Sequence, residues 1–483
     1  MAVTSLIPRL KTPGVYVEEI PKLPPSIAQV ETAIPAFIGY TEKAKDSRGL
    51  DLTNEPKRIT SLLEYERFFG GAQPETGIVV EINENSASKT FEVNGRISDS
   101  QRKKFLMYYA LQLFFSNGGG PCWIVSVGNY ESTGGEIVQV DLLAGLRATE
   151  RVNEITLYVF PDARGLTTAS DYYGLYTEAI DLCVKLQDRF TVADIWHDPA
   201  LPPDDWFANI EAMRNGLPSE VERIKYGASY FPELETTLDF WYGGEGVGDS
   251  RVTVNHAGGD GSLSGTLEEL RTKNNALYFR ARAAIRNIPC VMPPSPAMVG
   301  VYARVDVSRG VWKAPANVGV NSVIRPTIIL TDEDQSRLNV DTVAGKSVNV
   351  IRAFTGRGII VWGARTLAGN DNEWRYVPVR RFFNMVEESA KNASAQFVFE
   401  PNNRNTWTRV RSMIENFLTL QWRAGALIGT TTEEAYYVRV GLNETMDEFD
   451  IFEGRMIVEI GMAVVRPAEF IILQFSHKML AES

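Results

Sequence analysis

The spacing of apolar residues divides the middle of the chain into short strands and longer helices. Compact apolar runs bounded by turn residues predict strands at 122–127, 155–160 and 190–196. Apolar positions at helical spacing predict helices over 171–190 and 204–215. Strands that alternate with helices of this length are typical of βαβ units, so the pattern predicts a mainly parallel sheet.

The last third of the chain has a different pattern, in which two amphipathic helices precede short strands. The first helix has one apolar face, formed by Phe382, Val386, Ala390, Ala393 and Phe397. The second has an apolar face opposite a polar one, and the polar face consists of Arg409, Ser412, Asn416 and Arg423. Strands follow at 435–440 and 455–465, and this order of elements predicts a separate α+β domain.

Two segments interrupt the α/β pattern. Alternation around turn residues predicts a hairpin near 77–100, and the many Gly, Asp and Ser residues of 243–265 predict an exposed loop. At 483 residues the chain exceeds one hydrophobic core. We therefore expect a multidomain α/β and α+β protein with these parts: an N-terminal arm and proline leash (1–28), an α/β region with both insertions (29–345), an α+β domain (346–466) and a C-terminal strand arm (467–483).

Both ends of the chain carry a β-rich run without an obvious partner nearby. Pro21, Pro24 and Pro25 follow the first run and favour an extended leash rather than a hairpin. A lone strand is unstable in water because both of its edges carry unpaired N–H and C=O groups. We expect other copies of the chain to accept these strands. The donated residues are Val15, Tyr16, Val17 and Ile20 at one end and Phe470, Ile471, Ile472 and Leu473 at the other. An internal strand of the same domain is the alternative for the second run.

Composition narrows the class of protein. Hydrophobic residues make up 44% and charged residues 23%, as in an ordinary soluble globular protein. We expect no transmembrane helix, because no apolar run reaches about 18 residues, and no secretory signal at 1–10. Cys122, Cys183 and Cys290 lie among apolar residues, which predicts buried free thiols in a reducing cytoplasm. The formal charge of −11 argues against a nucleic-acid binder.

Charge is unevenly distributed along the chain. Residues 351–423 contain ten Arg and one Lys against six Asp or Glu, a window of +5 (11 − 6). One interpretation is a basic face that binds an acidic partner. The other is scattered surface charge, with Arg411 and Glu415 forming an ordinary i,i+4 pair.

Few residues suggest catalysis. The three histidines, His197, His256 and His477, form no metal-binding pattern with cysteine, and no cofactor is expected. Gly345-Lys346-Ser347 resembles the end of a phosphate-binding loop, but Val340 stands where that loop needs a glycine. The remaining enzymatic alternative is a hydrolase-like site that uses Asp162 and His197, both at the ends of predicted strands. Carboxylates at such positions are also common helix caps.

Several blocks of the sequence resemble the contractile tail sheath family of phages and phage-derived injection particles. The blocks span nearly the whole chain and are densest after residue 293: 12–19, 293–306, 309–317, 358–367, 373–376, 379–381, 399–402, 422–427 and 466–470. Among them are Gly363-Ala364-Arg365, Phe399-Glu400-Pro401-Asn402 and Arg466-Pro467-Ala468-Glu469-Phe470. The chain departs from the family at 339–347, where relatives commonly carry an Asn-Pro stretch.

The resemblance implies a structural protein rather than an enzyme. Family members build a sleeve of stacked rings around an inner tube, and their terminal arms join neighbouring subunits while the sleeve contracts. The expected partners are copies of the chain, the inner tube, and baseplate and cap proteins, without direct nucleic-acid contact or membrane insertion. The α/β region is expected to face outward, and Arg409 and Arg423 are candidates for contact with the tube. Synthesis is expected in a bacterial cytoplasm, followed by assembly into a phage tail or a released injection particle.

Overall fold

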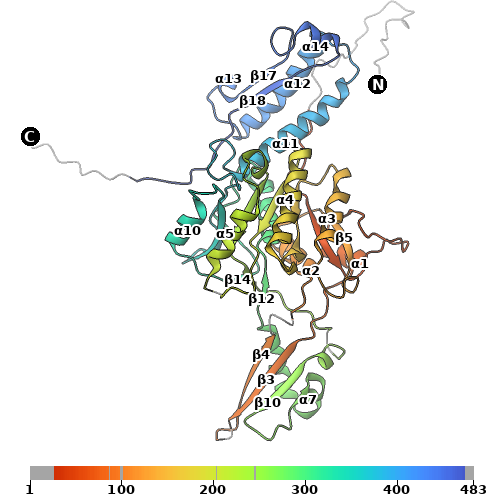
Figure 1. Ribbon diagram of the computed structural model, residues 1–483, viewed down its shortest axis with the longest axis vertical. Helices are drawn as coiled ribbons and strands as arrows, with labels where there is room; N and C mark the ends of the chain where they lie inside the picture. The colour runs from red at the N-terminus through yellow and green to blue at the C-terminus, as the bar shows by residue number, and fades with distance from the viewer. Residues whose placement is uncertain (1–26, 86, 98–101, 203, 244–245, 474–483) are drawn as a thin grey trace, which may run out of the picture. The chain divides into compact units, whose positions relative to one another are not determined.

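The computed structural model describes residues 27–85, 87–97, 102–202, 204–243 and 246–473 (Figure 1). These residues form two compact units. The α/β unit contains residues 30–388 and 465–473, and the α+β unit contains residues 27–29 and 389–464. A mixed α/β architecture with several sheets agrees with the fold class expected from the sequence.

A nine-stranded sheet forms the centre of the α/β unit, in the order β13-β16-β15-β8-β7-β6-β1-β5-β2. Its inner strands are parallel: β5 (Cys122–Asn129), β1 (Pro35–Thr41), β6 (Leu157–Val159), β7 (Phe190–Asp194), β8 (Gly227–Phe231) and β15 (Val348–Phe354). Antiparallel strands complete the edges: β2 (Lys57–Ile59), β16 (Gly358–Val361) and β13 (Val318–Gly319). The prediction of strands near 122, 155 and 190 in a mainly parallel sheet is confirmed.

Helices cover both faces of this sheet, which explains why its inner strands are almost wholly apolar. Phe37 of β1 lies in a core with α2 (Met107–Ser116) and α9 (Ser295–Arg309). The neighbouring Ala36 and Ile38 lie in a second core with α3 (Gln139–Ala148) and α4 (Ala169–Leu186). All seven residues of β1 are buried. Helix α4 ends before the predicted residue 190 because Gln187 adopts a left-handed cap conformation.

The two insertions form one small sheet in the order β11-β10-β3-β4. The predicted hairpin is confirmed as β3 (Ile78–Asn85) and β4 (Thr90–Ile97). The predicted loop at 243–265 is wrong in part, because it contains β10 (Thr253–Ala257), which pairs in parallel with β3. Strand β11 (Gly265–Thr266) completes the sheet, and α7 (Leu267–Lys273) and α8 (Asn275–Arg286) follow it in the chain. The buried Val252 and Val254 anchor β10 in the core.

Further elements complete the α/β unit. Its remaining helices are α1 (Leu62–Phe69), α5 (Trp206–Gly216), α6 (Val221–Ile224) and α10 (Asp332–Asn339). Strands β12 (Cys290–Met292), β9 (Leu234–Thr236) and β14 (Val323–Pro326) form a three-stranded antiparallel sheet. Cys122, Cys183 and Cys290 are buried free thiols, as predicted.

The division between the two units falls later than the expected boundary at residue 346. Strand β15 pairs with β8, and β16 pairs with β15, so 348–361 belongs to the large sheet. The division lies within α11 (Val377–Ser394), after residue 388. The first four residues of β15 are buried, because a strand inside a parallel sheet is covered on both faces.

The α+β unit is built around α12 (Arg404–Arg423). Asn403 caps this helix by accepting hydrogen bonds from the N–H groups of Asn405 and Thr406. Its predicted apolar face is confirmed, since Val410, Ile414, Phe417 and Leu418 are buried. The other elements are α13 (Thr432–Ala435), α14 (Glu448–Phe452) and the antiparallel pair β17 (Tyr436–Arg439) and β18 (Glu459–Met462).

Asp162 joins three elements at the carboxyl end of the large sheet. Its buried carboxylate accepts hydrogen bonds from the N–H groups of Tyr40 (2.7 Å), Leu106 (2.6 Å) and Met107 (3.2 Å). Burial raises the pKa of Asp162 to about 7, although these three hydrogen bonds favour the charged form. A Cβ atom at Gly39 would lie 2.3 Å from the carboxylate, so the strand needs glycine there. The geometry gives Asp162 a structural role.

We expect Asp162→Ala to destabilise the protein by about 2–4 kcal/mol, because it leaves three buried N–H groups without an acceptor. Asp162→Asn keeps one acceptor oxygen and should cost less. Urea unfolding followed by tryptophan fluorescence measures both changes, with the exposed Asp204→Ala as the control. An unchanged midpoint for Asp162→Ala would show that the carboxylate does not hold these elements together.

Candidate functional site

The predicted C-terminal arm begins as an exposed apolar run on the α/β unit. Phe470, Ile471, Ile472 and Leu473 are between 72% and 82% exposed. Residues 466–473 form no strand within the described part of the chain (Figure 1). The predicted N-terminal strand residues, Val15, Tyr16, Val17 and Ile20, lie outside the described residues. Four consecutive apolar side chains in this state need a partner surface to leave water.

A buried ionic cluster holds the root of this run, and we call it the C-terminal anchor. The guanidinium of Arg365 contacts the carboxylate of Glu469 at 2.6 Å from Nη2 and 3.0 Å from Nε. Asn339 donates to the same carboxylate at 2.8 Å and the Tyr376 hydroxyl at 3.1 Å. The side chain of Arg365 is only 4% exposed. Burial alone would raise the pKa of Glu469, but the hydrogen bonds from Arg365 and Asn339 hold it below its ordinary value.

The large sheet positions the C-terminal anchor. Asn349, a buried residue of β15, accepts from the N–H of Arg365 and donates to its C=O, both at 2.7 Å. Arg365 also forms an antiparallel bridge with Tyr376. The backbone of Arg365 is therefore fixed on two sides. These contacts do not involve Glu469, so they orient the guanidinium independently of the arm.

A second buried cluster, the N-terminal anchor, holds the start of the α/β unit. Arg381 of α11 contacts Asp306 of α9 through two hydrogen bonds, of 2.5 and 3.1 Å. Thr32 donates to the same carboxylate at 2.5 Å, and the C=O of Thr32 accepts from Arg381 at 2.8 Å. The side chains of Arg381 and Asp306 are 3% and 6% exposed. Because the α/β unit begins at residue 30, this cluster fixes the point where the chain enters that unit.

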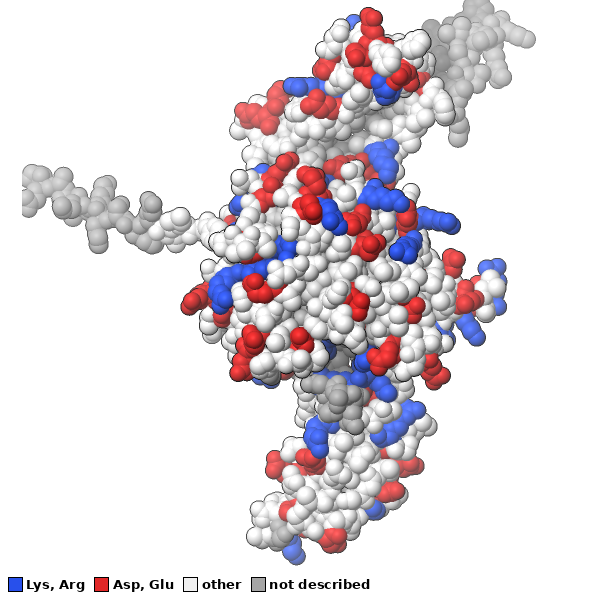
Figure 2. Space-filling model, viewed as in Figure 1, with Lys and Arg blue, Asp and Glu red and all other residues white. Residues whose placement is uncertain are grey.

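Most arginines of the basic window bind carboxylates inside their own unit. Arg365 and Arg381 belong to the two anchors, and Arg380 contacts Glu387 at 2.8 Å. The predicted surface pair between Arg411 and Glu415 is wrong, because Arg411 instead contacts Glu444 at 2.6 Å. Acidic and basic side chains are interspersed over the visible face of the α/β unit (Figure 2). These charges mainly stabilise the fold.

Arg409 and Arg423 are both exposed on the polar side of α12. Arg409 is 54% exposed and lies 3.6 Å from Glu400, with its guanidinium 5.2 Å from the centre of the Phe397 ring. An exposed ion pair of this kind contributes little stability. Their contact with an inner tube stays a prediction.

The α+β unit offers open strand edges. Strands β17 and β18 pair from Tyr436 with Met462 to Arg439 with Glu459. Among the described residues they form a two-stranded sheet, so each strand has one edge without a strand neighbour. Such edges present unpaired N–H and C=O groups that can accept a further strand.

The structure does not bring Asp162 and His197, the two residues of the enzymatic alternative, into contact. His197 is exposed, and its Nδ1 lies 3.3 Å from the amide nitrogen of Asn209. No hydrogen bond or ion pair joins it to Asp162 in the described part of the chain, and Asp162 does not line the pocket that contains His197. The ammonium of Lys346, in the phosphate-loop resemblance, donates to the C=O groups of Arg214 and Leu217 at the end of α5. Lys346 therefore caps a helix.

The described residues contain neither a metal-binding cluster nor a membrane-spanning helix. No group of three or more His, Cys, Asp or Glu residues there could hold a metal ion. No helix in that part of the chain is long and apolar enough to cross a membrane.

Comparisons with known sequences identify two domains. Residues 261–367 match the family model of the phage tail sheath protein central domain, and residues 369–478 match that of the phage tail sheath C-terminal domain. The tail sheath protein of Burkholderia phage BcepMu is 30% identical over 142 residues, 28% of this chain and 29% of that protein. The match to the tail sheath protein of Vibrio phage KVP40 is 23% identical and covers 38% of this chain and 26% of that protein. The chain thus spans less than a third of these curated relatives.

Solved structures match over almost the full length. The helical sheath of the anti-feeding prophage in the contracted state is 32% identical, with a TM-score of 0.63, over 97% of this chain and 100% of that one. The PVC sheath complex of an extracellular contractile injection system, also contracted, is 29% identical with the same TM-score, over 97% and 98% of the two chains. The α/β and α+β units described above therefore belong to a known architecture, and the chain is a member of the contractile tail sheath family.

Proposed function

We propose that this chain polymerises into a helical contractile sleeve around an inner tube. Contraction from a metastable extended state would drive the tube through a target envelope. One observation carries the proposal: the α/β unit presents an exposed apolar run on a buried anchor, while the α+β unit has open strand edges. One copy thus offers what another copy lacks. A head-to-tail contact of this kind repeats without closing and generates a helical filament.

Two kinds of interaction would contribute to the free energy of donating one strand. Each backbone hydrogen bond to an open edge of β17 or β18 would contribute about 0.5–1.5 kcal/mol. Burial of Phe470, Ile471, Ile472 and Leu473 would add about 1.5–3 kcal/mol for each side chain. Part of this gain offsets the entropy lost when the arm is ordered. The remainder, summed over a filament, makes the lattice continuous. The N-terminal strand, at Val15, Tyr16, Val17 and Ile20, would join a second edge in the same way.

The anchors fit a protein whose arms transmit force. When subunits rotate during contraction, the arms remain paired and the pull falls on their roots. Losing one partner of a fully buried ion pair costs about 3–5 kcal/mol. Arg381–Asp306 is close to that limit and Arg365–Glu469 is partly exposed at the carboxylate, and both pairs resist detachment. The described part of the arm between the anchor and solvent contains no regular structure that would have to break. The joints can bend while the lattice stays connected.

Contraction then needs no nucleotide at the moment of firing. If each subunit gains a few kcal/mol on collapse, roughly the worth of a few buried contacts, many subunits together release a large total. The energy is stored during assembly in the extended lattice. The α/β unit would face outward. Arg409 and Arg423, exposed on α12, would face the inner tube and attract acidic groups on it.

The similar structures suggest which proteins would contact the sleeve. The anti-feeding prophage chains that this protein resembles come from structures of its helical sheath and its baseplate. For this chain we propose the same self-association, a baseplate and a cap as partners, and neither direct nucleic-acid contact nor membrane insertion. Synthesis would take place in a bacterial cytoplasm, and the assembled particle would be a phage tail or a released injection system.

Removal of the arms tests this function. We expect a chain without residues 1–20, and separately the double variant Ile471→Asp and Ile472→Asp, to keep the wild-type unfolding midpoint but to form no tubes or sleeves in negative-stain electron microscopy. The matched control is Leu50→Asp and Leu63→Asp, two exposed apolar residues away from the arms, which should still polymerise. Sleeves formed by both arm variants would contradict strand donation. Loss of folding would show that the arms belong to their own core.

The C-terminal anchor should be sensitive to acid. The folded pKa of Glu469 lies below its unfolded value, so its stabilisation is complete above about pH 4.5 and is lost as pH falls through the folded pKa. A dye attached to a cysteine introduced by Ile471→Cys reports the mobility of the arm through its fluorescence anisotropy. The three native thiols are buried and do not compete for the dye. We expect anisotropy to drop in acid for the otherwise wild-type chain and to be low at every pH with Glu469→Gln.

The control for this titration is Glu459→Gln, which removes a carboxylate from the α+β unit. It should leave the titration of the dye unchanged. An anisotropy that is the same with Glu469 and with Gln at that position, from neutral pH to acid, would contradict the role of the anchor.

A further inference from the structure

A pocket at the carboxyl end of the large sheet is lined by no residue of either anchor. It has a volume of about 360 Å³. Its lining follows three adjacent parallel strands: Arg164 comes after β6, Trp196 and His197 after β7, and Phe231 and Glu233 at the end of β8. Loops from these neighbouring parallel strands converge at this edge of the sheet. The volume lies within the range of small-molecule sites.

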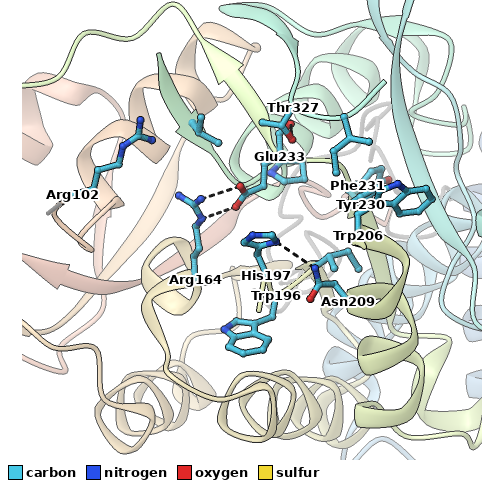
Figure 3. A pocket seen from close by; sticks show the side chains of 14 residues that line it. Arg102, Arg164, Trp196, His197, Trp206, Asn209, Tyr230, Phe231, Glu233 and Thr327 are labelled. Carbon is cyan, nitrogen blue, oxygen red and sulfur yellow. Dashed lines mark hydrogen bonds and ion pairs between the residues drawn. The ribbon is translucent and has the colours of Figure 1, made fainter. Parts of the chain in front are cut away.

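The two sides of the pocket differ in chemistry. Arg102, Arg164 and Glu233 lie on one side of His197, and Trp206, Tyr230 and Phe231 lie on the other (Figure 3). Trp206 is half-buried and packs against Phe231 in a tilted arrangement, with ring centres 5.5 Å apart and planes 30° apart. A half-buried indole that contacts a second ring is an apolar surface for another flat group.

Hydrogen bonds fix the orientation of Asn209 and with it the tautomer of His197. The N–H of Asp198 donates to Oδ1 of Asn209 at 3.0 Å, so the amide nitrogen of Asn209 must point the other way. That nitrogen lies 3.3 Å from Nδ1 of His197. Since an amide nitrogen only donates, Nδ1 accepts, and the ring proton is on Nε2. The pocket therefore presents His197 as a hydrogen-bond donor.

The charged side also presents donors. Arg164 and Glu233 form two contacts, of 2.5 Å from Nε and 2.9 Å from Nη2, so that pair is neutral. The Nη1 group of Arg164 makes no hydrogen bond with any described residue. Among the lining residues, Nη1 of Arg164 and Nε2 of His197 are thus N–H donors available to a ligand. A carboxylate, which accepts hydrogen bonds from both guanidinium and imidazole N–H groups, matches this side.

We propose that the pocket binds a small aromatic carboxylate. The ring stacks on the exposed face of Trp206, and the carboxylate accepts hydrogen bonds from Nε2 of His197 and from Arg164. No covalent step is involved, and the site is separate from both anchors and both open strand edges. The sheath subunit thus has a ligand-binding site with specificity for a flat anion.

The test uses phenylacetate as the probe and the purified full-length chain. Binding is measured by ligand-observed NMR titration, with 2-phenylethanol as the neutral analogue of the same shape and acetate as the anion without a ring. We expect saturable binding of phenylacetate below about 10 mM and at least about tenfold weaker binding of both analogues, as expected for the loss of a charged hydrogen bond or of the stacking surface.

Variants locate the site. His197→Ala and Trp206→Ala should each weaken phenylacetate binding by about fivefold or more, and Trp241→Ala, an exposed tryptophan outside the pocket, should not change it. His197 is exposed, so its variant folds even if the loss of Trp206 disturbs the local structure. Absence of saturable binding, equal binding of 2-phenylethanol, or binding unchanged by His197→Ala would each overturn the proposal. Polymerisation is a separate assay, and its outcome does not affect this one.

Discussion

Two buried arginine–carboxylate pairs determine how the rest of this molecule can work. A guanidinium that leaves water must find a carboxylate and further hydrogen bonds, or the fold loses several kcal/mol. Arg365 and Arg381 meet this condition with partners from distant parts of the chain, Glu469 and Asp306. Glu469 directly precedes the exposed run at 470–473, and Asp306 also accepts a hydrogen bond from Thr32 near the start of the unit. Desolvated charge thus fixes the positions where the chain enters and leaves the α/β unit.

The two units differ in how complete each one is by itself. The α/β unit has a core on each face of its sheet and is complete in itself. The α+β unit has one long amphipathic helix and a two-stranded sheet, and such a small sheet gains stability when further strands join it. In the proposed sleeve, association would complete the smaller unit while the larger one keeps its shape. A lattice of such subunits would change its geometry without unfolding them.

Sequence reasoning found what local pattern determines and missed what depends on distant partners. The strands near 122, 155 and 190 and the face of α12 follow from apolar spacing, and Phe470–Leu473 stood out as an apolar run. Strand β10 was not predicted, because its neighbour β3 lies far away in the sequence. No spacing marks Arg365 or Arg381 as buried, and only the blocks shared with the sheath family contain a hint of them. Arg411 paired outside its own helix, which an i,i+4 rule cannot anticipate.

The small sheet of the α/β unit has a consequence for how such proteins diversify. Strands β3 and β10 come from two insertions that are separated by most of the large sheet in the sequence, yet they form one hydrogen-bonded ladder. Deleting either insertion would leave the other with an unpaired strand edge and an exposed apolar surface. A shorter or longer version of this small sheet therefore requires coordinated changes in both insertions. The two insertions should be gained, lost or exchanged together.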